Sequence, residues 1–214
     1  AALAVAAGLS PLAKLSGLAV VAFAVATLGG LAWRRRDPRW FVRTAGPVVL
    51  ATCVLAGWWY VRNLRLYGDL TGVSHMLLPA IRRDFSVDRW LAGLPGELAG
   101  LWYSSWGLFG WFTVMLPGWV YGAISVAAAC GVLGLARAAR GRAPWLDWRR
   151  IGWLVAWWAL VFASLLRWMT IAKGGHGRLL FPAIAGLAVV LVAGWRALVP
   201  ARFSDRAFAA AVAF

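Results

Sequence analysis

The sequence has little charge for its length and very few cysteines. Only 14% of its 214 residues are charged, seven residues are acidic, and two are cysteines. An ordinary soluble domain has roughly 25% charged residues, so this composition excludes a soluble globular protein. The two cysteines exclude a disulfide scaffold, and the scarcity of charge excludes a disordered chain. The sequence also lacks a P-loop, HExxH, CxxC or complete GxGxxG motif, so none of these soluble-enzyme sites is encoded.

Apolar residues are what the sequence has in abundance, at 63% of the chain, with 16 tryptophans. A helical membrane crossing needs about 20 consecutive apolar residues. We therefore predict an all-α, polytopic membrane helix bundle in a single transmembrane domain over residues 1–214. Its predicted spans are residues 15–33, 44–60, 119–136, 151–170 and 180–195, with a partial sixth span at 207–214. Because the chain opens at Ala1 without Met and ends within an apolar run, we expect it to be a fragment of a larger protein.

Arginine clusters predict the orientation of these spans. Five arginines against one aspartate give residues 34–43 a net charge of +4, and the same balance gives +4 to residues 137–150. The long segment 61–117 carries only +1, from five arginines and four acidic residues. The positive-inside rule places the arginine clusters in the cytoplasm and loops 61–117 and 171–179 outside, in an inner (plasma) membrane. The net charge of +15 then reflects orientation, and we expect no nucleic-acid partner.

The long outer loop contains its own structural signals. Ser86 is a candidate N-cap for a helix that runs to Trp102, with apolar residues at helical spacing and an interruption at Pro95. The aromatic segment 102–112 is too apolar for a solvated loop and too rich in glycine for a regular span. We expect it to be re-entrant or to rest on the membrane.

Cations gather on the predicted outer side. Ionisable groups near membrane spans are costly, so each is a candidate functional residue. The alternative is that each long side chain only reaches the lipid headgroups. A cluster of outer cations favours binding of an anion such as a lipid phosphate, which makes membrane lipid an expected partner. The cluster consists of Lys14, Arg62, Arg65, Arg167, Lys173, His176 and Arg178.

Carboxylates on the same side could act as a general base. Asp69 is the candidate catalytic residue, and its alternative explanation is a turn aspartate between Gly68 and Leu70. We identify no metal ligands and no cofactor, and the need for a divalent cation is left open.

Several strings resemble bacterial multi-pass C-type glycosyltransferases of the phospholipid carrier-dependent, dolichyl-phosphate-mannose mannosyltransferase-like kind. Residues 58–63 (WWYVRN) and 67–72 (YGDLTG) resemble their Trp-Tyr-x-Arg-Asn and Tyr-Gly-Asp-Pro-x-Gly signature, with Leu70 in place of the proline. Residues 12–16 (LAKLS) resemble their Leu-Thr-Lys segment. Residues 106–111 and 116–121 are similar to a pattern in a related family of predicted membrane proteins. Residues 177–182 (GRLLFP) resemble Gly-Arg-Tyr-Leu-Phe-Pro, with Leu179 in place of the tyrosine.

The resemblance covers the later half of that family. It implies a polyprenyl-phosphate-linked sugar as donor, transfer to an acceptor on the outer face, and a catalytic carboxylate in an earlier loop, upstream of Ala1. Under this resemblance the substrate-binding residues are Lys14, Arg62, Asn63, Tyr67, Trp106, His176 and Arg178.

Two other function classes fit the same sequence. A lipid or glycan transporter or flippase component would use the cations to escort a phosphate headgroup, although the predicted spans have few polar residues at their centres. A non-catalytic membrane assembly subunit would use small residues such as Gly131 and Gly134 for helix contacts.

Overall fold

The structure is a computed structural model that describes residues 2–77, 79, 81–109, 113–141 and 143–199. Helices dominate it, which confirms the all-α class. Five helical segments are long and apolar enough to cross a membrane: Gly17–Arg35, Pro38–Tyr67, Gly118–Arg140, Trp148–Met169 and Gly177–Leu198. The protein is therefore a multi-pass helical membrane protein. The predicted partial span 207–214 lies outside the described residues.

The chain divides into two compact units. Unit 1 comprises Ala1–Phe85 together with Leu166–Lys173, and unit 2 comprises Ser86–Leu165 together with Gly174–Phe214. Each unit is described by itself below.

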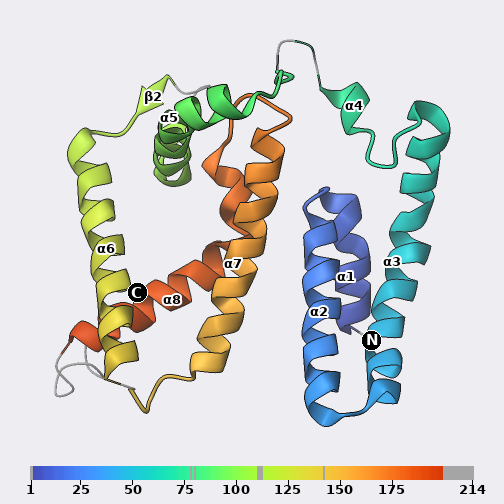
Figure 1. Cartoon of the computed structure of the whole chain (residues 1–214), viewed down its shortest axis with the longest axis horizontal. Helices are drawn as coiled ribbons and strands as arrows, with labels where there is room; N and C mark the ends of the chain where they lie inside the picture. Colours follow the sequence, from blue (N-terminus) through green and yellow to red (C-terminus); the bar gives the residue numbers. More distant parts are fainter. Residues whose placement is uncertain (1, 78, 80, 110–112, 142, 200–214) are drawn as a thin grey trace. The chain divides into compact units, whose positions relative to one another are not determined.

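Unit 1 is built on three helices, α1 (Ala2–Ala13), α2 (Gly17–Arg35) and α3 (Pro38–Tyr67), which pack side by side (Figure 1). Small buried residues form the contact: Ala4, Ala7 and Val48 make up its core, and residues of α2 such as Val25 pack against them. α1 was not predicted, because its twelve residues are too few to cross a membrane and contain Pro11. It lies instead against the two long helices.

The bounds of α3 differ from the predicted span 44–60. The helix begins at Pro38 and continues to Tyr67, so the first seven residues of the predicted outer loop are helical. Arg62 and Arg65 do not end the helix, because long basic side chains can extend toward water while the backbone stays helical. Beyond it, the short helix α4 (Val73–Met76) follows a turn that begins at Gly68.

Unit 2 contains α5 (Val87–Trp106), the two-residue strands β1 (Leu108–Phe109) and β2 (Val114–Met115), α6 (Gly118–Arg140), α7 (Trp148–Met169) up to Leu165, the 3₁₀ segment η1 (Gly177–Ala183) and α8 (Ile184–Leu198). α6 and α8 cross closely: Gly134 lies against Gly194, and the indole N–H of Trp195 donates to the carbonyl of Ala127 at 2.7 Å.

Proline explains why the last span begins with η1 instead of a regular helix. Pro182 has no N–H and disrupts the helical bonding pattern. Its carbonyl accepts a hydrogen bond of 3.0 Å from the Trp157 indole of α7. The membrane-length segment therefore starts at Gly177, three residues before the predicted start of the span at 180.

α5 confirms the predicted helix, continues four residues past its predicted end at Trp102, and corrects two further details. The helix starts just after Ser86 and ends at Trp106, but the Ser86 side chain makes no capping hydrogen bond. It runs through Pro95 without interruption, because one missing N–H donor removes one backbone bond and the turns on either side continue. After the helix, β1 and β2 pair antiparallel. The first residues of segment 102–112 are therefore helical, and residues 108–109 form one strand of a short hairpin. Residues 110–112 lie outside the described residues.

Candidate functional site

The turn after α3 surrounds the candidate base Asp69. Gly68 and Gly72, on either side of it, have φ angles of 65° and 68°, a left-handed conformation that costs glycine nothing. Between them, the Asp69 carboxylate accepts hydrogen bonds from the N–H and hydroxyl of Thr71, at 2.9 and 2.8 Å, and from those of Ser74, both at 3.0 Å. These bonds, led by the Ser74 N–H, hold the pKa of Asp69 well below its ordinary value. Asp69 therefore has a structural role in the turn and the properties of a weak general base.

Asn63 and Tyr67 connect this turn to α3. Asn63 is only 2% exposed, and its amide nitrogen donates to the carbonyl of Leu70 at 3.4 Å. The Tyr67 ring packs against His75 with ring centroids 4.9 Å apart. Both residues have partners within the turn, and their predicted role in substrate binding stays a prediction.

Lys14 and Arg62 lie at the same end of unit 1. The hydroxyl of Tyr60 donates to the carbonyl of Pro11 at 3.3 Å, which joins the end of α1 to the last turns of α3. Lys14 follows Pro11 closely, and Arg62 follows Tyr60 by two residues; both are exposed. The Arg62 guanidinium stands over the ring of Trp59, 5.1 Å from its centroid. The structure therefore brings these two predicted cations to one end of a helical bundle.

A backbone pairing in unit 1 that was not predicted brings two basic residues to the same side. Residues 81–83 lie antiparallel to residues 171–173, and the N–H groups of Arg83 and Lys173 donate to opposite carbonyls at 2.9 and 2.7 Å. Because alternate residues of paired strands share a face, Arg83 and Lys173 lie on the same side of this pairing. The two segments are about ninety positions apart, and no local pattern in the sequence indicates that they pair.

In unit 2 the first residue of η1, Gly177, packs directly against α5. The Gly177 N–H donates to the hydroxyl of Ser104 at 2.8 Å, across 73 residues of sequence. A side chain at Gly177 would collide with Ser105, so only glycine allows this approach. The contact leaves His176 half-buried and Arg178 exposed on either side of it. Ser104 and Ser105 were not predicted as site residues, because nothing in their spacing distinguishes them from other helix residues.

An apolar pocket of about 170 Å³ lies beside this contact. Its lining from α5 includes Trp106, and the Trp106 indole nitrogen is buried without a hydrogen-bond partner among the described residues. The pocket is lined by carbon-rich side chains and one hydroxyl: Leu98, Leu101, Trp102, Ser105, Trp106, Trp158, Phe162, Gly177, Leu180, Phe181, Ile184 and Leu187. An apolar chain is the ligand that such a surface accommodates.

His176 is held in its neutral form by this environment. Burial lowers the pKa of His176 below its ordinary value of 6.5, and the positive charge of Arg178 lowers it further. At neutral pH the imidazole is therefore uncharged, with one nitrogen as donor and the other as acceptor. Arg178, the residue after Gly177 of the pocket wall, carries a positive charge.

The predicted site residues thus fall into two groups. Lys14, Arg62, Asn63, Tyr67 and Asp69 belong to unit 1, whereas Trp106, His176 and Arg178 belong to unit 2. Within the described part of the chain, no three His, Cys, Asp or Glu residues are grouped so that they could hold a metal ion.

Comparisons of the chain with protein-family models, with curated proteins and with solved structures gave no match.

Proposed function

We propose that this chain is part of an integral membrane glycosyltransferase that moves a sugar from a polyprenyl-phosphate carrier to an acceptor at the outer face of the inner membrane. One observation carries the proposal: the wall of the apolar pocket in unit 2 includes Gly177, which lies between His176 and Arg178. A polyprenyl phosphate combines an apolar chain with an anionic group, so it needs adjacent apolar and cationic surfaces. Trp106 and its neighbours would contact the chain, and Arg178 would contact the phosphate.

The proposed orientation follows from the arginine clusters. We place residues 34–43 and 137–150 in the cytoplasm, where the positive-inside rule puts basic segments. The pocket of unit 2 and the turn at Asp69 then belong to the outer face. The resemblance assigns substrate contacts to Lys14, Arg62, Asn63 and Tyr67 as well, and we propose these as a separate group within unit 1.

Sugar transfer requires stabilisation of the leaving phosphate. The acceptor hydroxyl oxygen forms a bond to the anomeric carbon, and the bond from that carbon to the phosphate oxygen breaks, with its electron pair going to the oxygen. Negative charge on the phosphate therefore grows in the transition state, and a guanidinium beside it lowers the barrier more than it tightens ground-state binding. The acceptor's proton goes to a carboxylate base, which the resemblance places in an earlier loop of the family fold. Asp69 is poorly suited to that task, because its oxygens already accept four hydrogen bonds.

The test is a donor-turnover assay on the intact protein in proteoliposomes. Release of polyprenyl phosphate from a radiolabelled polyprenyl-phosphate sugar is measured with membrane extract as the source of acceptor. We expect Arg178→Gln to lower kcat by about a hundredfold, as loss of a transition-state donor does. Trp106→Ala should raise the KM for the donor, since it removes contact area from the chain.

Arg150→Gln is the matched control, because it removes one exposed arginine from a different helix end. It should leave both constants unchanged. Equal turnover by Arg178→Gln and the unaltered protein would refute the role of Arg178. Crosslinking of a photoreactive carrier lipid without any turnover in the intact protein would instead favour a transporter or an assembly subunit. Gly131 and Gly134 pack against α8 within this chain, so they give no support to the assembly-subunit alternative.

A further inference from the structure

The connection between α2 and α3 is a tight turn that crowds arginines at one end of unit 1 (Figure 1). α2 ends at Arg35, Arg36 and Asp37 form the turn, and Pro38 begins α3. The Asp37 carboxylate caps α3 by accepting from the Trp40 N–H at 2.9 Å. The five exposed arginines at this end are Arg34, Arg35, Arg36, Arg39 and Arg43.

Arg36 occupies a backbone conformation that disfavours it. Its φ of 51° is left-handed, and Arg36 is the one non-glycine residue with positive φ among the described residues. Glycine would adopt this conformation without strain and is the residue that helix ends usually place there. A strained residue of this kind indicates that its side chain serves a purpose that glycine cannot meet.

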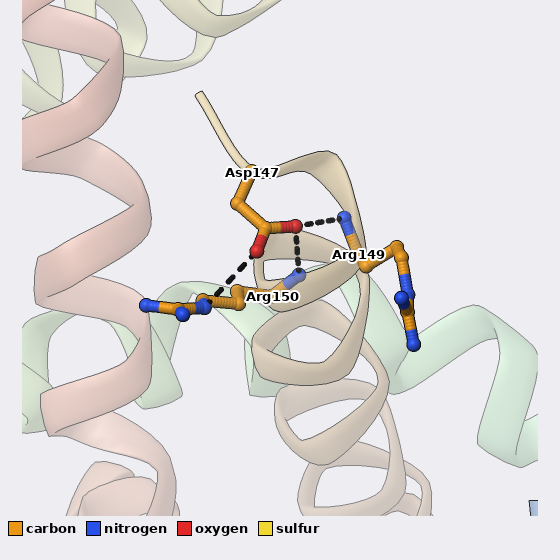
Figure 2. A network of polar contacts seen from close by, with 3 residues as sticks. All are labelled: Asp147, Arg149 and Arg150. Atoms are coloured by element: carbon orange, nitrogen blue, oxygen red, sulfur yellow. Dashed lines mark hydrogen bonds and ion pairs between the residues drawn. The ribbon is translucent and has the colours of Figure 1, made fainter. Parts of the chain in front are cut away.

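Among the residues that the structure describes, these arginines have no acidic partner. Within the described residues none of the five forms an ion pair, although Arg35 stands 4.6 Å from the ring centroid of Trp40. In the basic segment 137–150 one arginine does have an acidic partner: Asp147 accepts hydrogen bonds from the backbone N–H groups of Arg149 and Arg150 and forms an ion pair of 3.0 Å with the Arg150 side chain (Figure 2). The positive charge of the arginines at the α2–α3 end is therefore available to an external anion.

A groove of about 630 Å³ opens beside Arg36. Its apolar lining comes from Gly29, Ala32, Trp33, Pro38 and Phe41, and Trp33 is 86% exposed. Arg36 and Asp37 are its charged members. Within the groove lining Arg36 and Asp37 balance each other, and the four further exposed arginines of the same helix end make the net charge there positive. A ligand that fits this surface has an apolar chain next to a group of net negative charge.

We infer that the groove at the α2–α3 turn, with the Arg36 guanidinium in its lining and four more arginines at the same helix end, binds an anionic phospholipid of the surrounding membrane. The lipid phosphate accepts hydrogen bonds from Arg36, and an acyl chain lies along Trp33 and Phe41. Zwitterionic phospholipids bind more weakly there, since their positively charged ammonium group offsets the phosphate charge. This site involves none of the residues proposed for sugar transfer.

The experiment uses the full chain in detergent micelles, where native mass spectrometry resolves lipid-bound states. Phosphatidylglycerol and phosphatidylcholine with identical acyl chains are titrated separately. We expect the anionic lipid to bind at least tenfold more tightly than the zwitterionic one to the unaltered protein. Arg36→Gln should reduce that preference about tenfold, and Arg36→Lys should retain most of it. Arg150→Gln, which removes one charge from the ion-paired cluster, should change it less than twofold.

Arg36→Gly separates binding from folding. Because glycine relieves the strained φ, this variant should unfold at the same temperature as the unaltered protein or higher, and still lose the lipid preference. Equal binding of the two lipids by the unaltered protein would overturn the inference. Equal effects of Arg36→Gln and Arg150→Gln would also overturn it, because they would show that only total charge matters.

Discussion

The contact between η1 and α5 predicts a large effect from a single methyl group at Gly177. A Cβ built there would lie 2.5 Å from the Ser105 Cα and closer still to its backbone nitrogen and hydroxyl. The colliding atoms include the backbone of a helix, which cannot move aside as a flexible side chain could. Gly177→Ala must therefore separate η1 from α5 or strain both.

The size of the effect follows from two contributions. Overpacking of this kind costs about 1–3 kcal/mol. Separation also breaks the 2.8 Å hydrogen bond from the Gly177 N–H to Ser104, which contributes about 1 kcal/mol. The loss in the free energy of unfolding should therefore be about 2–4 kcal/mol, whereas Ser104→Ala alone should lose about 1 kcal/mol.

Thermal unfolding of the full chain in detergent, followed by circular dichroism, measures this loss. Hydrogen exchange over residues 175–183 should rise in Gly177→Ala, which locates the change. Gly152→Ala is the matched control, since no described atom outside its own helix lies within 4 Å of the added Cβ and alanine favours helix. An unfolding temperature of Gly177→Ala equal to that of the unaltered protein would refute the close approach of η1 to α5.

Two further predictions concern unit 2. The Tyr121 hydroxyl donates to the Gly107 carbonyl at 2.7 Å and accepts from the Leu116 N–H at 3.0 Å, so Tyr121→Phe should lower stability by about 1–3 kcal/mol in thermal unfolding; no loss would show that water replaces the hydroxyl. Because folding lowers the pKa of His176, the unfolded chain binds the proton more readily, so stability should be full above pH 6.5 and fall as the pH drops toward the lower folded pKa. Unfolding temperatures measured from pH 8 to 5 should show this fall in the unaltered protein and a smaller one in His176→Gln, and parallel curves would contradict it.

The long helices were predictable because a membrane crossing is written in consecutive apolar residues. Their ends were less so: α3 passes through Arg62 and Arg65, since a charged side chain on a long stem does not break a helix. α5 was found from Ser86 and its apolar spacing, and its passage through Pro95 was not. Local signals of this kind locate an element better than its boundaries.

The arrangement of the candidate residues was far less accessible. Nothing near Gly177 indicates that Ser104 and Ser105 receive it, and nothing near Arg83 indicates a pairing with residues 171–173. Both contacts join segments remote in sequence through backbone N–H donors, which every residue type except proline has. Composition and spacing carry no record of such contacts.

The formal charge of a segment does not show how many of its ionised groups are free to bind a partner. The two aspartates that follow the long helices of unit 1 are examples. The carboxylate oxygens of Asp69 accept hydrogen bonds from Thr71 and Ser74, and one oxygen of Asp37 accepts a hydrogen bond from a helix N–H. A carboxylate used in this way keeps its charge but has less capacity to accept hydrogen bonds from a neighbouring guanidinium. The arginines near these turns therefore keep donors for phosphate even where the formal charge of the segment is close to balanced. The phosphate binding that we propose at both ends of these helices would depend on this division of roles, in which aspartates stabilise the turns and arginines contact the phosphate.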